Sequence, residues 1–380
     1  MEQPEPVAFL GECGEGLVTR RGFLTGALSG GVLFAAASAL PRSAVAAKAT
    51  PPNVQAVFSN DAYTSLVPAA VGGPMIANPH VISLRWLGCS CYELVHRGKV
   101  YLLDAWFDRG PRTRPVGITP EQVIQTEAIF IGHAHFDHIA DAPPIAARTG
   151  ATIIGAPIST RYGASVGTPA NQLQTVTGLG GELLHFDGFT VEPILAHHAV
   201  APTRTNSKGE TVAQALFDLY SAALDPFTTA EVAEFQAVLA RGSFDPLIIT
   251  QGTIAYLFTF DSGYRLVWID SGGPITSQLT TVMSRVGNTD LAIASYTLQG
   301  VPDLQVPVTM SLVNLFTPDL FLPCHHDQII LLPFNAALPD MATEPLRLAI
   351  RETMPNTQII PPLYRSPVTV NTKTGAYSVA

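Results

Sequence analysis

Alternating and continuous apolar runs predict that the first half of the chain is built largely from β-hairpins. Val81 to Leu103 carries two β-type runs around a central turn. Leu183–Leu195 and Thr253–Ile269 repeat the pattern, with Asp-Gly and Asp-Ser-Gly at their turns. We therefore expect three hairpins, each with one face in the core.

The pattern changes after the first hairpin, where single strands alternate with helices. Strands are predicted at Glu127–Ile131, in the runs ATIIGAP, LAIASYT and DLFLPC, and at Arg365–Val370; helices are predicted at Asp141–Gly150 and Thr343–Glu352. Asp141 stands where it could cap the first of these helices. Hairpins followed by strand–helix alternation predict an α/β fold of two sheets flanked by helices.

Residues 199–251 interrupt this pattern with a helical segment. Thr228 and Glu231 form a capping-box sequence, and Val232, Phe235 and Leu239 follow on one helical face. We interpret the segment as a helical insertion beside the active site that shapes substrate access.

The N-terminal 46 residues have the pattern of a twin-arginine signal peptide. Arg20 and Arg21 precede a Gly-rich, weakly apolar run that ends at Ala44-Val45-Ala46. Residues 47–80 then form a Pro- and Ala-rich irregular leader that wraps the surface, and 81–380 form the main domain. The signal predicts export to the periplasm or exterior through the twin-arginine machinery, and its cleavage is left open. Proteins on this route are folded before export, often around a metal or cofactor.

The amino-acid composition limits the classes of protein to which the chain can belong. The chain has 380 residues, 47% of them hydrophobic and 13% charged, which suffices for a sizeable core and excludes a disordered chain. The net charge is −9 with scattered Lys and Arg, so a nucleic-acid partner is not expected. Small-molecule or lipid-like substrates remain, and the oligomeric state is not predicted.

The stretch FIGHAHFDHIAD concentrates metal-binding side chains at the end of an apolar strand. His133 and His135 point to the same side of an extended backbone. If a helix follows, Asp137 and His138 turn toward the same pocket. Imidazole and carboxylate suit zinc, which takes N and O ligands at about 2.0–2.2 Å.

Other predicted strands end in residues of the same chemistry. They are Asp104 after YLL, His197 and His198 after ILA, Asp270 after LVWI, and His325 and His326 after LFLPC.

In this order the residues resemble the motifs of the metallo-β-lactamase superfamily, over roughly Val81 to Gln328. The run RWLGCSCYELVHRGKVYLLDAWF further resembles the opening hairpin of the branch that holds the L-ascorbate-6-phosphate lactonases and N-acyl-phosphatidylethanolamine phospholipase D. The resemblance implies a four-layer αβ/βα sandwich with two metal ions, expected to be zinc, with iron or manganese as alternatives.

The resemblance also implies roles for the individual residues. His133, His135 and His198 would hold the first metal, Asp137, His138 and His325 would hold the second, Asp270 would bridge both, and Asp104 would orient a ligand. Asp137 would in addition orient the nucleophile and accept its proton. The choice of His198 over His197, and of His325 over His326, stays open at this point, and His326 is also a candidate oxyanion donor.

The implied function is an exported hydrolase that uses a metal-bound hydroxide on an ester, lactone or phosphodiester bond. One alternative is an iron-dependent oxidoreductase on the same fold, which is disfavoured because His135 stands where that branch has a carboxylate. Another is a β-lactamase that acts on cyclic amides. Of the remaining residues, Cys89, Cys91, Trp86 and Trp106 are expected in the core, and His80, His96 and His185 at the surface.

Overall fold

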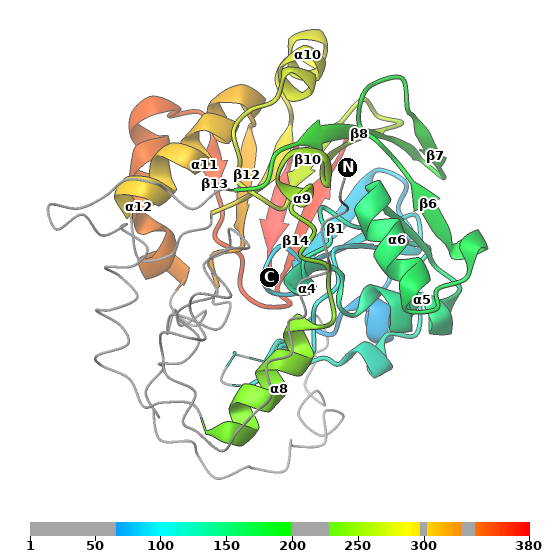
Figure 1. Cartoon of the computed structure of the whole chain (residues 1–380). Helices are drawn as coiled ribbons and strands as arrows, with labels where there is room; N and C mark the ends of the chain where they lie inside the picture. Colours follow the sequence, from blue (N-terminus) through cyan, green and yellow to red (C-terminus); the bar gives the residue numbers. More distant parts are fainter. Residues whose placement is uncertain (1–65, 112, 114, 200–227, 297–301, 328–338) are drawn as a thin grey trace, which may run out of the picture.

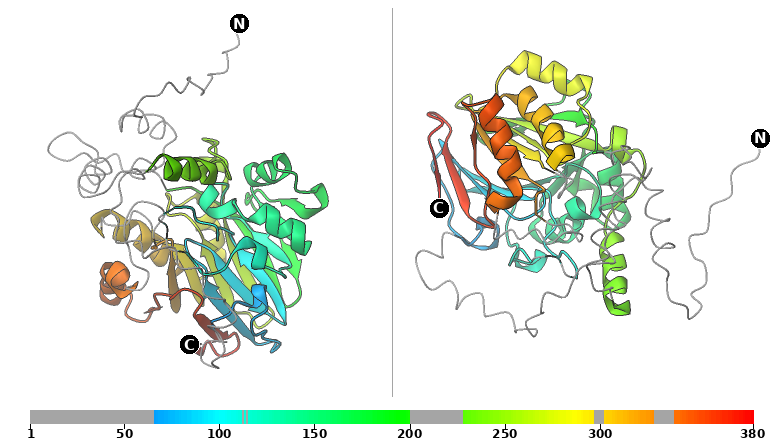
Figure 2. Two further views of the ribbon diagram at one scale, coloured as in Figure 1. Left: turned by 90° about the horizontal axis from the view of Figure 1, so that it is seen from below. Right: turned by 90° about the vertical axis from the view of Figure 1, so that its left-hand side faces the viewer.

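A computed structural model describes residues 66–111, 113, 115–199, 228–296, 302–327 and 339–380. Two β-sheets pack face to face, and helices cover both outer faces (Figures 1 and 2). This confirms the expected four-layer αβ/βα sandwich. The signal peptide, most of the leader and residues 200–227 of the insertion lie outside the described residues.

The first sheet has eight strands in the order β15-β14-β1-β2-β3-β4-β5-β6. Their bounds are β1 Val81–Trp86, β2 Tyr92–His96, β3 Lys99–Leu103, β4 Ala128–Phe130, β5 Thr152–Gly155, β6 Leu173–Thr175, β14 Pro367–Asn371 and β15 Tyr377–Val379. Pairing is antiparallel from β15 to β3 and parallel from β3 to β6.

The second sheet has seven strands in the order β13-β12-β11-β10-β9-β8-β7. Their bounds are β7 Leu184–Phe186, β8 Phe189–Ala196, β9 Thr253–Phe260, β10 Arg265–Ile269, β11 Leu291–Ser295, β12 Leu320–Cys324 and β13 Gln358–Ile359. The β7–β8 and β9–β10 hairpins are those predicted from the alternation, and β10 to β13 are parallel.

Helices separate into two outer layers. Figure 1 shows α10, α11 and α12 on one side of the sheets and α5 and α6 on the other. The bounds are α4 Phe136–Ile139, α5 Ala142–Thr149, α6 Pro157–Ser165, α8 Thr229–Leu239, α9 Ile248–Gln251, α10 Ser277–Val286, α11 Pro302–Phe316 and α12 Pro339–Thr353, with short 3₁₀ turns η2 Ala69–Val71, η3 Pro120–Gln122 and η4 Ala170–Gln172. In the described part of the chain, no helix combines the length and apolar character needed to cross a bilayer.

Three apolar clusters hold the layers together, and the twofold alternation along each strand decides which cluster a residue joins. On β9, Tyr256 and Phe258 enter the cluster between the sheets, whereas Ala255 and Leu257 face α10 and α11. On β3, Leu102 faces the layer of α4, α5 and α8 instead. The central strands of both sheets are thus buried on their two faces, as expected of strands covered by helices.

Some local predictions were wrong. The first β-type run breaks into β1 and β2 because Gly88 and Cys89 adopt left-handed backbone angles, with φ of 87° and 50°. Asp141 occupies the N-cap position of α5, but its side chain makes no capping bond there. It instead accepts hydrogen bonds from the backbone N–H groups of Phe107 and Asp108, at 2.5 and 3.0 Å.

Burial corrects two further expectations. His96 is 1% exposed rather than at the surface, because the Phe189 and Phe260 rings pack edge-on against it. Within the described part of the leader, Ala69 and Ala70 are fully buried, because the backbone N–H of Ala70 donates to the buried carboxylate of Glu93 at 2.6 Å.

The described end of the insertion lies against the metal-ligand loop. The capping box of α8 is present as predicted, with the backbone N–H of Glu231 donating to the Thr228 hydroxyl at 3.2 Å. Phe235 is buried in the cluster beneath α8. After α8, the N–H of Ser243 donates to the carbonyl of Ala134 at 2.7 Å, between two predicted metal ligands.

Candidate metal centre

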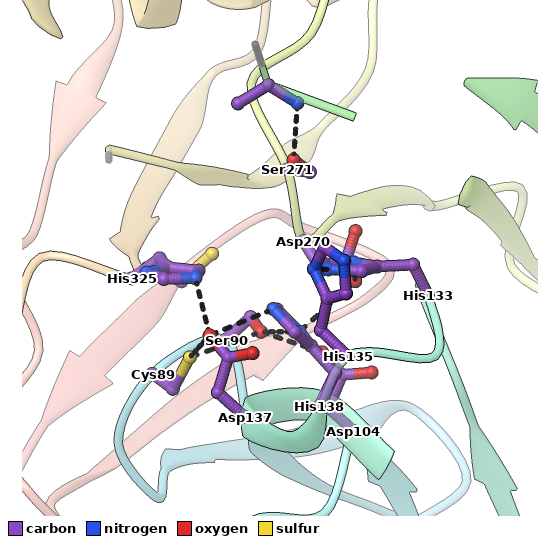
Figure 3. Close-up of polar contacts among 12 residues, drawn as sticks. Cys89, Ser90, Asp104, His133, His135, Asp137, His138, Asp270, Ser271 and His325 are labelled. Atoms are coloured by element: carbon purple, nitrogen blue, oxygen red, sulfur yellow. Dashed lines mark hydrogen bonds and ion pairs between the residues drawn. The ribbon is translucent and has the colours of Figure 1, made fainter. Parts of the chain in front are cut away.

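Five strands deliver the predicted site residues to one edge of the sandwich. Each residue follows its strand by one to three positions: Asp104 after β3, His133 after β4, His198 after β8, Asp270 after β10 and His325 after β12. β3 and β4 are parallel neighbours, and β8, β10 and β12 run in the same direction within the second sheet. The carboxyl ends of these strands therefore meet, and Figure 3 shows the side chains of Asp104, His133, Asp270 and His325 converging there.

Three histidines form the first cluster. His133 Nε2 lies 2.8 Å from His135 Nδ1. The His198 ring centroid is 4.5 Å from that of His133 and 4.7 Å from that of His135. One nitrogen from each of the three rings lies within 4.8 Å of the others, an arrangement that could hold a metal ion.

The second cluster begins with the short helix α4. His135 precedes the helix, and Asp137 and His138 lie within it. Asp137 Oδ2 is 3.5 Å from His138 Nε2 and 3.4 Å from His325 Nε2. The turn into a helix thus brings Asp137 and His138 toward the end of β12, as the sequence predicts.

Asp270 lies between the two clusters. Its Oδ2 is 2.6 Å from His133 Nδ1 and 3.2 Å from His138 Nδ1. Its Oδ1 is buried without a hydrogen-bond partner. The residue thus contacts one ring of each cluster through one oxygen and leaves the other oxygen available to a cation.

Asp104 supports His138 from behind. Asp104 Oδ2 lies 2.7 Å from His138 Nδ1 and accepts from the Ser90 hydroxyl at 2.6 Å. Asp104 Oδ1 accepts from the backbone N–H of Gly132 at 2.9 Å. The carboxylate therefore fixes the ring orientation of one candidate ligand, as second-sphere carboxylates commonly do.

The geometry distinguishes the members of the two histidine pairs. His198 and His325 join the clusters, whereas His197 and His326 belong to none of the possible metal groups of the described residues. The His326 ring stacks on Trp86, with centroids 4.3 Å apart, and burial lowers its pKa to about 4. The ring of His326, the candidate oxyanion donor, is therefore packed against Trp86.

The buried carboxylates of the site favour the binding of cations. Asp104, Asp137 and Asp270 are all buried, and within the described part of the chain their ion pairs are with histidine. Buried anions are costly unless they are paired or bind metal. Asp137 Oδ1 and Asp270 Oδ1 have no hydrogen-bond partner. This set of imidazoles and carboxylates fits divalent transition metals.

A comparison with models of protein families identifies the family of the chain. A family model described as "Beta-lactamase superfamily domain" matches residues 99–311, more than half of the sequence. The chain belongs to this superfamily. The matched range includes Asp104, the His133–His138 motif, His198 and Asp270, and ends before His325.

Curated relatives match parts of the chain. The superfamily member is 36% identical over 100 residues to a UPF0173 metal-dependent hydrolase of Roseiflexus castenholzii, over 24% of this chain and 38% of that protein. It is 40% identical over 98 residues to a UPF0173 metal-dependent hydrolase of Chloroflexus aurantiacus, over the same shares of 24% and 38%. The chain thus spans less than two-fifths of the length of these two relatives.

Solved structures that match this superfamily member share little sequence with it. Igni18, described as a novel metallo hydrolase from Ignicoccus hospitalis, is 15% identical, with a TM-score of 0.49 over 76% of this chain and 98% of the other. An isothiocyanate hydrolase from Delia radicum gut bacteria is 14% identical, with a TM-score of 0.47 over 76% and 99%.

Several residues near the clusters were not predicted as part of the site. Cys89 was assigned to the core and is buried, but its Sγ also lies 3.9 Å from Asp137 Oδ2. Ser90 bonds to Asp104, and a buried ion pair between Arg109 and Asp327 lies behind the turn at Cys89. In the sequence, the only signal was that Asp327 follows the second histidine pair directly.

Proposed function

We propose that the protein is a metal-dependent hydrolase that binds two divalent cations, expected to be zinc. The observation that carries the proposal is the pair of adjacent donor clusters, one of three histidines and one of a carboxylate with two histidines. When bound, such cations would lower the pKa of a metal-bound water and polarise the bond to be cleaved.

The histidines of the first cluster are suited to hold a cation as neutral ligands. Burial, reinforced by the neighbouring imidazoles, lowers the pKa of His133 and His135 well below the ordinary value. Their lone pairs therefore stay available at neutral pH. His198 follows the same logic, because burial lowers its pKa to about 4.

Asp137 is suited to accept a hydrogen bond from the attacking water and so to orient it. Burial alone would raise its pKa, but the adjacent His138 and His325 outweigh burial and hold the pKa well below its ordinary value. The carboxylate is therefore ionised. Its Oδ2 faces the two imidazoles, and its buried Oδ1 has no hydrogen-bond partner and can receive the bond from water.

The substrate bond we propose is an ester, lactone or phosphodiester bond in a small or lipid-like molecule. Phe244 lies beside the first cluster, with its ring 5.6 Å from that of His135, and it is 40% exposed. An exposed aromatic ring at this position would contact an apolar group of the substrate. The resemblance of the opening hairpin to the lactonase and phospholipase D branch supports the same class.

We further propose that the protein is exported by the twin-arginine machinery and acts outside the cytoplasm. The support is Arg20-Arg21 and the apolar run that ends at Ala44-Val45-Ala46. Replacement of both arginines by lysine should leave the protein in the cytoplasm. Export that persists in this variant would contradict the proposal.

A substrate panel tests the hydrolase. Zinc-loaded protein should hydrolyse at least one of a set of aryl esters, lactones, phosphodiesters and β-lactams, and His135→Ala should abolish that activity. His185→Ala, which changes an exposed histidine far from the clusters, is the matched control and should retain it.

Metal analysis of protein loaded in its native host separates this proposal from the oxidoreductase alternative. Two zinc ions per chain would support a hydrolase. Two irons without zinc would contradict it, as would activity that is unchanged in His135→Ala.

A further inference from the structure

Cys89 reaches the second donor cluster from the turn between β1 and β2. One ligand atom from each of Cys89, Asp137, His138 and His325 lies within 4.8 Å of the other three (Figure 3). The distances to Asp137 Oδ2 are 3.9 Å from the sulfur, and 3.5 and 3.4 Å from the two imidazole nitrogens.

The separations from Asp137 Oδ2 are close to those around one tetrahedral ion. Ligand atoms at zinc–ligand lengths of about 2.0–2.3 Å and tetrahedral angles lie about 3.3–3.5 Å apart. The two nitrogens already stand at such distances from the carboxylate, and the sulfur needs a shift of less than about half an ångström, which a χ1 adjustment supplies. All four side chains are thus close enough to share one ion after small side-chain adjustments.

The backbone of Cys89 is fixed to the strand end that carries His325. The N–H of His325 donates to the Cys89 carbonyl at 2.7 Å, and the N–H of Cys89 donates to Asp327 Oδ1 at 2.9 Å. Asp327 is held in turn by Arg109 Nη1 at 2.6 Å. Cys89 and His325 are thus presented together, which is the preorganisation that a metal site requires.

A second observation points to a ligand at this position. Asp137 is 4% exposed, and its Oδ1 has no hydrogen-bond partner although it is buried. A carboxylate oxygen in that state is rarely left unsatisfied in a folded protein. A cation at Oδ2, between Cys89 and Asp137, would compensate the buried charge of this carboxylate and place the thiol against a positive charge, while Oδ1 stays available to water.

We propose that the Cys89 thiolate is the fourth protein ligand of the second metal position. The inference rests on the proposed two-cation function. Four protein ligands close a tetrahedral zinc site, whereas three leave a position for water or substrate. The open position therefore falls to the site of His133, His135 and His198. A thiolate also favours zinc over magnesium or manganese at the second position.

Cobalt substitution tests this assignment without any substrate. The full-length protein, stripped of metal and titrated with Co²⁺, should develop the strong near-ultraviolet absorption of a thiolate–cobalt bond. Cys89→Ser should lose this band but keep the weaker visible bands of cobalt bound by the three histidines, and its tightly bound cobalt should fall by half. Cys91→Ser and Cys324→Ser change the other buried cysteines of the described residues and should keep the band.

The outcomes separate the two proposals. Cobalt bound by the wild type without a thiolate band, or a band that persists in Cys89→Ser, would overturn the role of Cys89 and leave the two-cation hydrolase standing. A wild-type protein that binds no cobalt or zinc would overturn both. If Cys89→Ser does not fold, X-ray absorption of the zinc-loaded wild type decides, because it must show a sulfur neighbour at about 2.3 Å.

Discussion

Asp104 lies directly behind His138, with its Oδ2 atom 2.7 Å from Nδ1 of the ring. The opposite ring nitrogen, Nε2, faces Asp137. The carboxylate therefore selects the tautomer that leaves Nε2 free to bind a cation, because it accepts the proton carried by Nδ1. Asp104 acts through His138 rather than on the substrate.

Removal of this support should weaken metal binding. Asp104→Ala should lower the affinity for zinc about 10–100-fold, measured by competition with a chromophoric chelator. Asp104→Asn keeps an oxygen that can accept from Nδ1–H and should recover part of the loss. Equal affinities in Asp104→Ala and in a control at the exposed Asp187 would contradict the role.

Gly132 is required because Asp270 lies where a side chain would begin. A Cβ at position 132 would stand 2.0 Å from the Asp270 carboxyl carbon. Gly132→Ala should therefore displace Asp270, destabilise the fold by about 1–3 kcal/mol and reduce the metal content of the protein. Gly263→Ala meets no atom within 4 Å but strains a φ of 87°, so it should cost some stability and leave metal content unchanged. Metal analysis and thermal unfolding of both variants measure this difference.

The convergence of the strand ends could be predicted because each feature that indicates it lies within a short stretch of sequence. His133 and His135 alternate on an extended segment, and the polar residues that follow the apolar runs mark the strand ends. Parallel order then places those ends at one edge. The β7–β8 and β9–β10 hairpins were equally clear, since the alternating strands and their Asp-Gly or Asp-Ser-Gly turns lie within about ten residues of one another.

Contacts that join distant segments could not be predicted in this way. Cys89 and Asp327 are 238 positions apart, and nothing in the periodicity around either residue signals their bond. His96 stands at the start of a polar-looking turn, but the fold covers it with Phe189 and Phe260. In α11, the internal Pro307 obscured the helical pattern that tertiary packing maintains, whereas α12 contains the helix predicted at Thr343–Glu352.

Replacement of only one partner of the Arg109–Asp327 ion pair should strongly destabilise the fold. Both side chains are 1% exposed, and Asp327 also accepts from the Tyr364 hydroxyl. Arg109→Met would leave a buried carboxylate without its cation, and we expect a loss of about 3–5 kcal/mol in the free energy of unfolding. The double variant Arg109→Met/Asp327→Leu should lose less than Arg109→Met alone, since no unpaired charge remains. Urea unfolding of the variants measures the coupling, and additive losses would contradict it.

His96 should make the fold sensitive to mild acid. Burial is the main cause that lowers its pKa below the ordinary value of 6.5, and its Nδ1 lies 3.3 Å from the carbonyl of Val81. As the pH falls below 6.5, the unfolded chain takes up a proton that the folded chain refuses, so stability decreases until the pH passes the folded pKa. His96→Asn retains a donor toward Val81 and cannot take up this proton. The stability of that variant should therefore depend less steeply on pH over this range, measured by urea unfolding at several pH values. His185→Asn, at an exposed position of β7, should keep the slope of the wild type. An equal slope in the wild type and His96→Asn would show that acid acts on other groups.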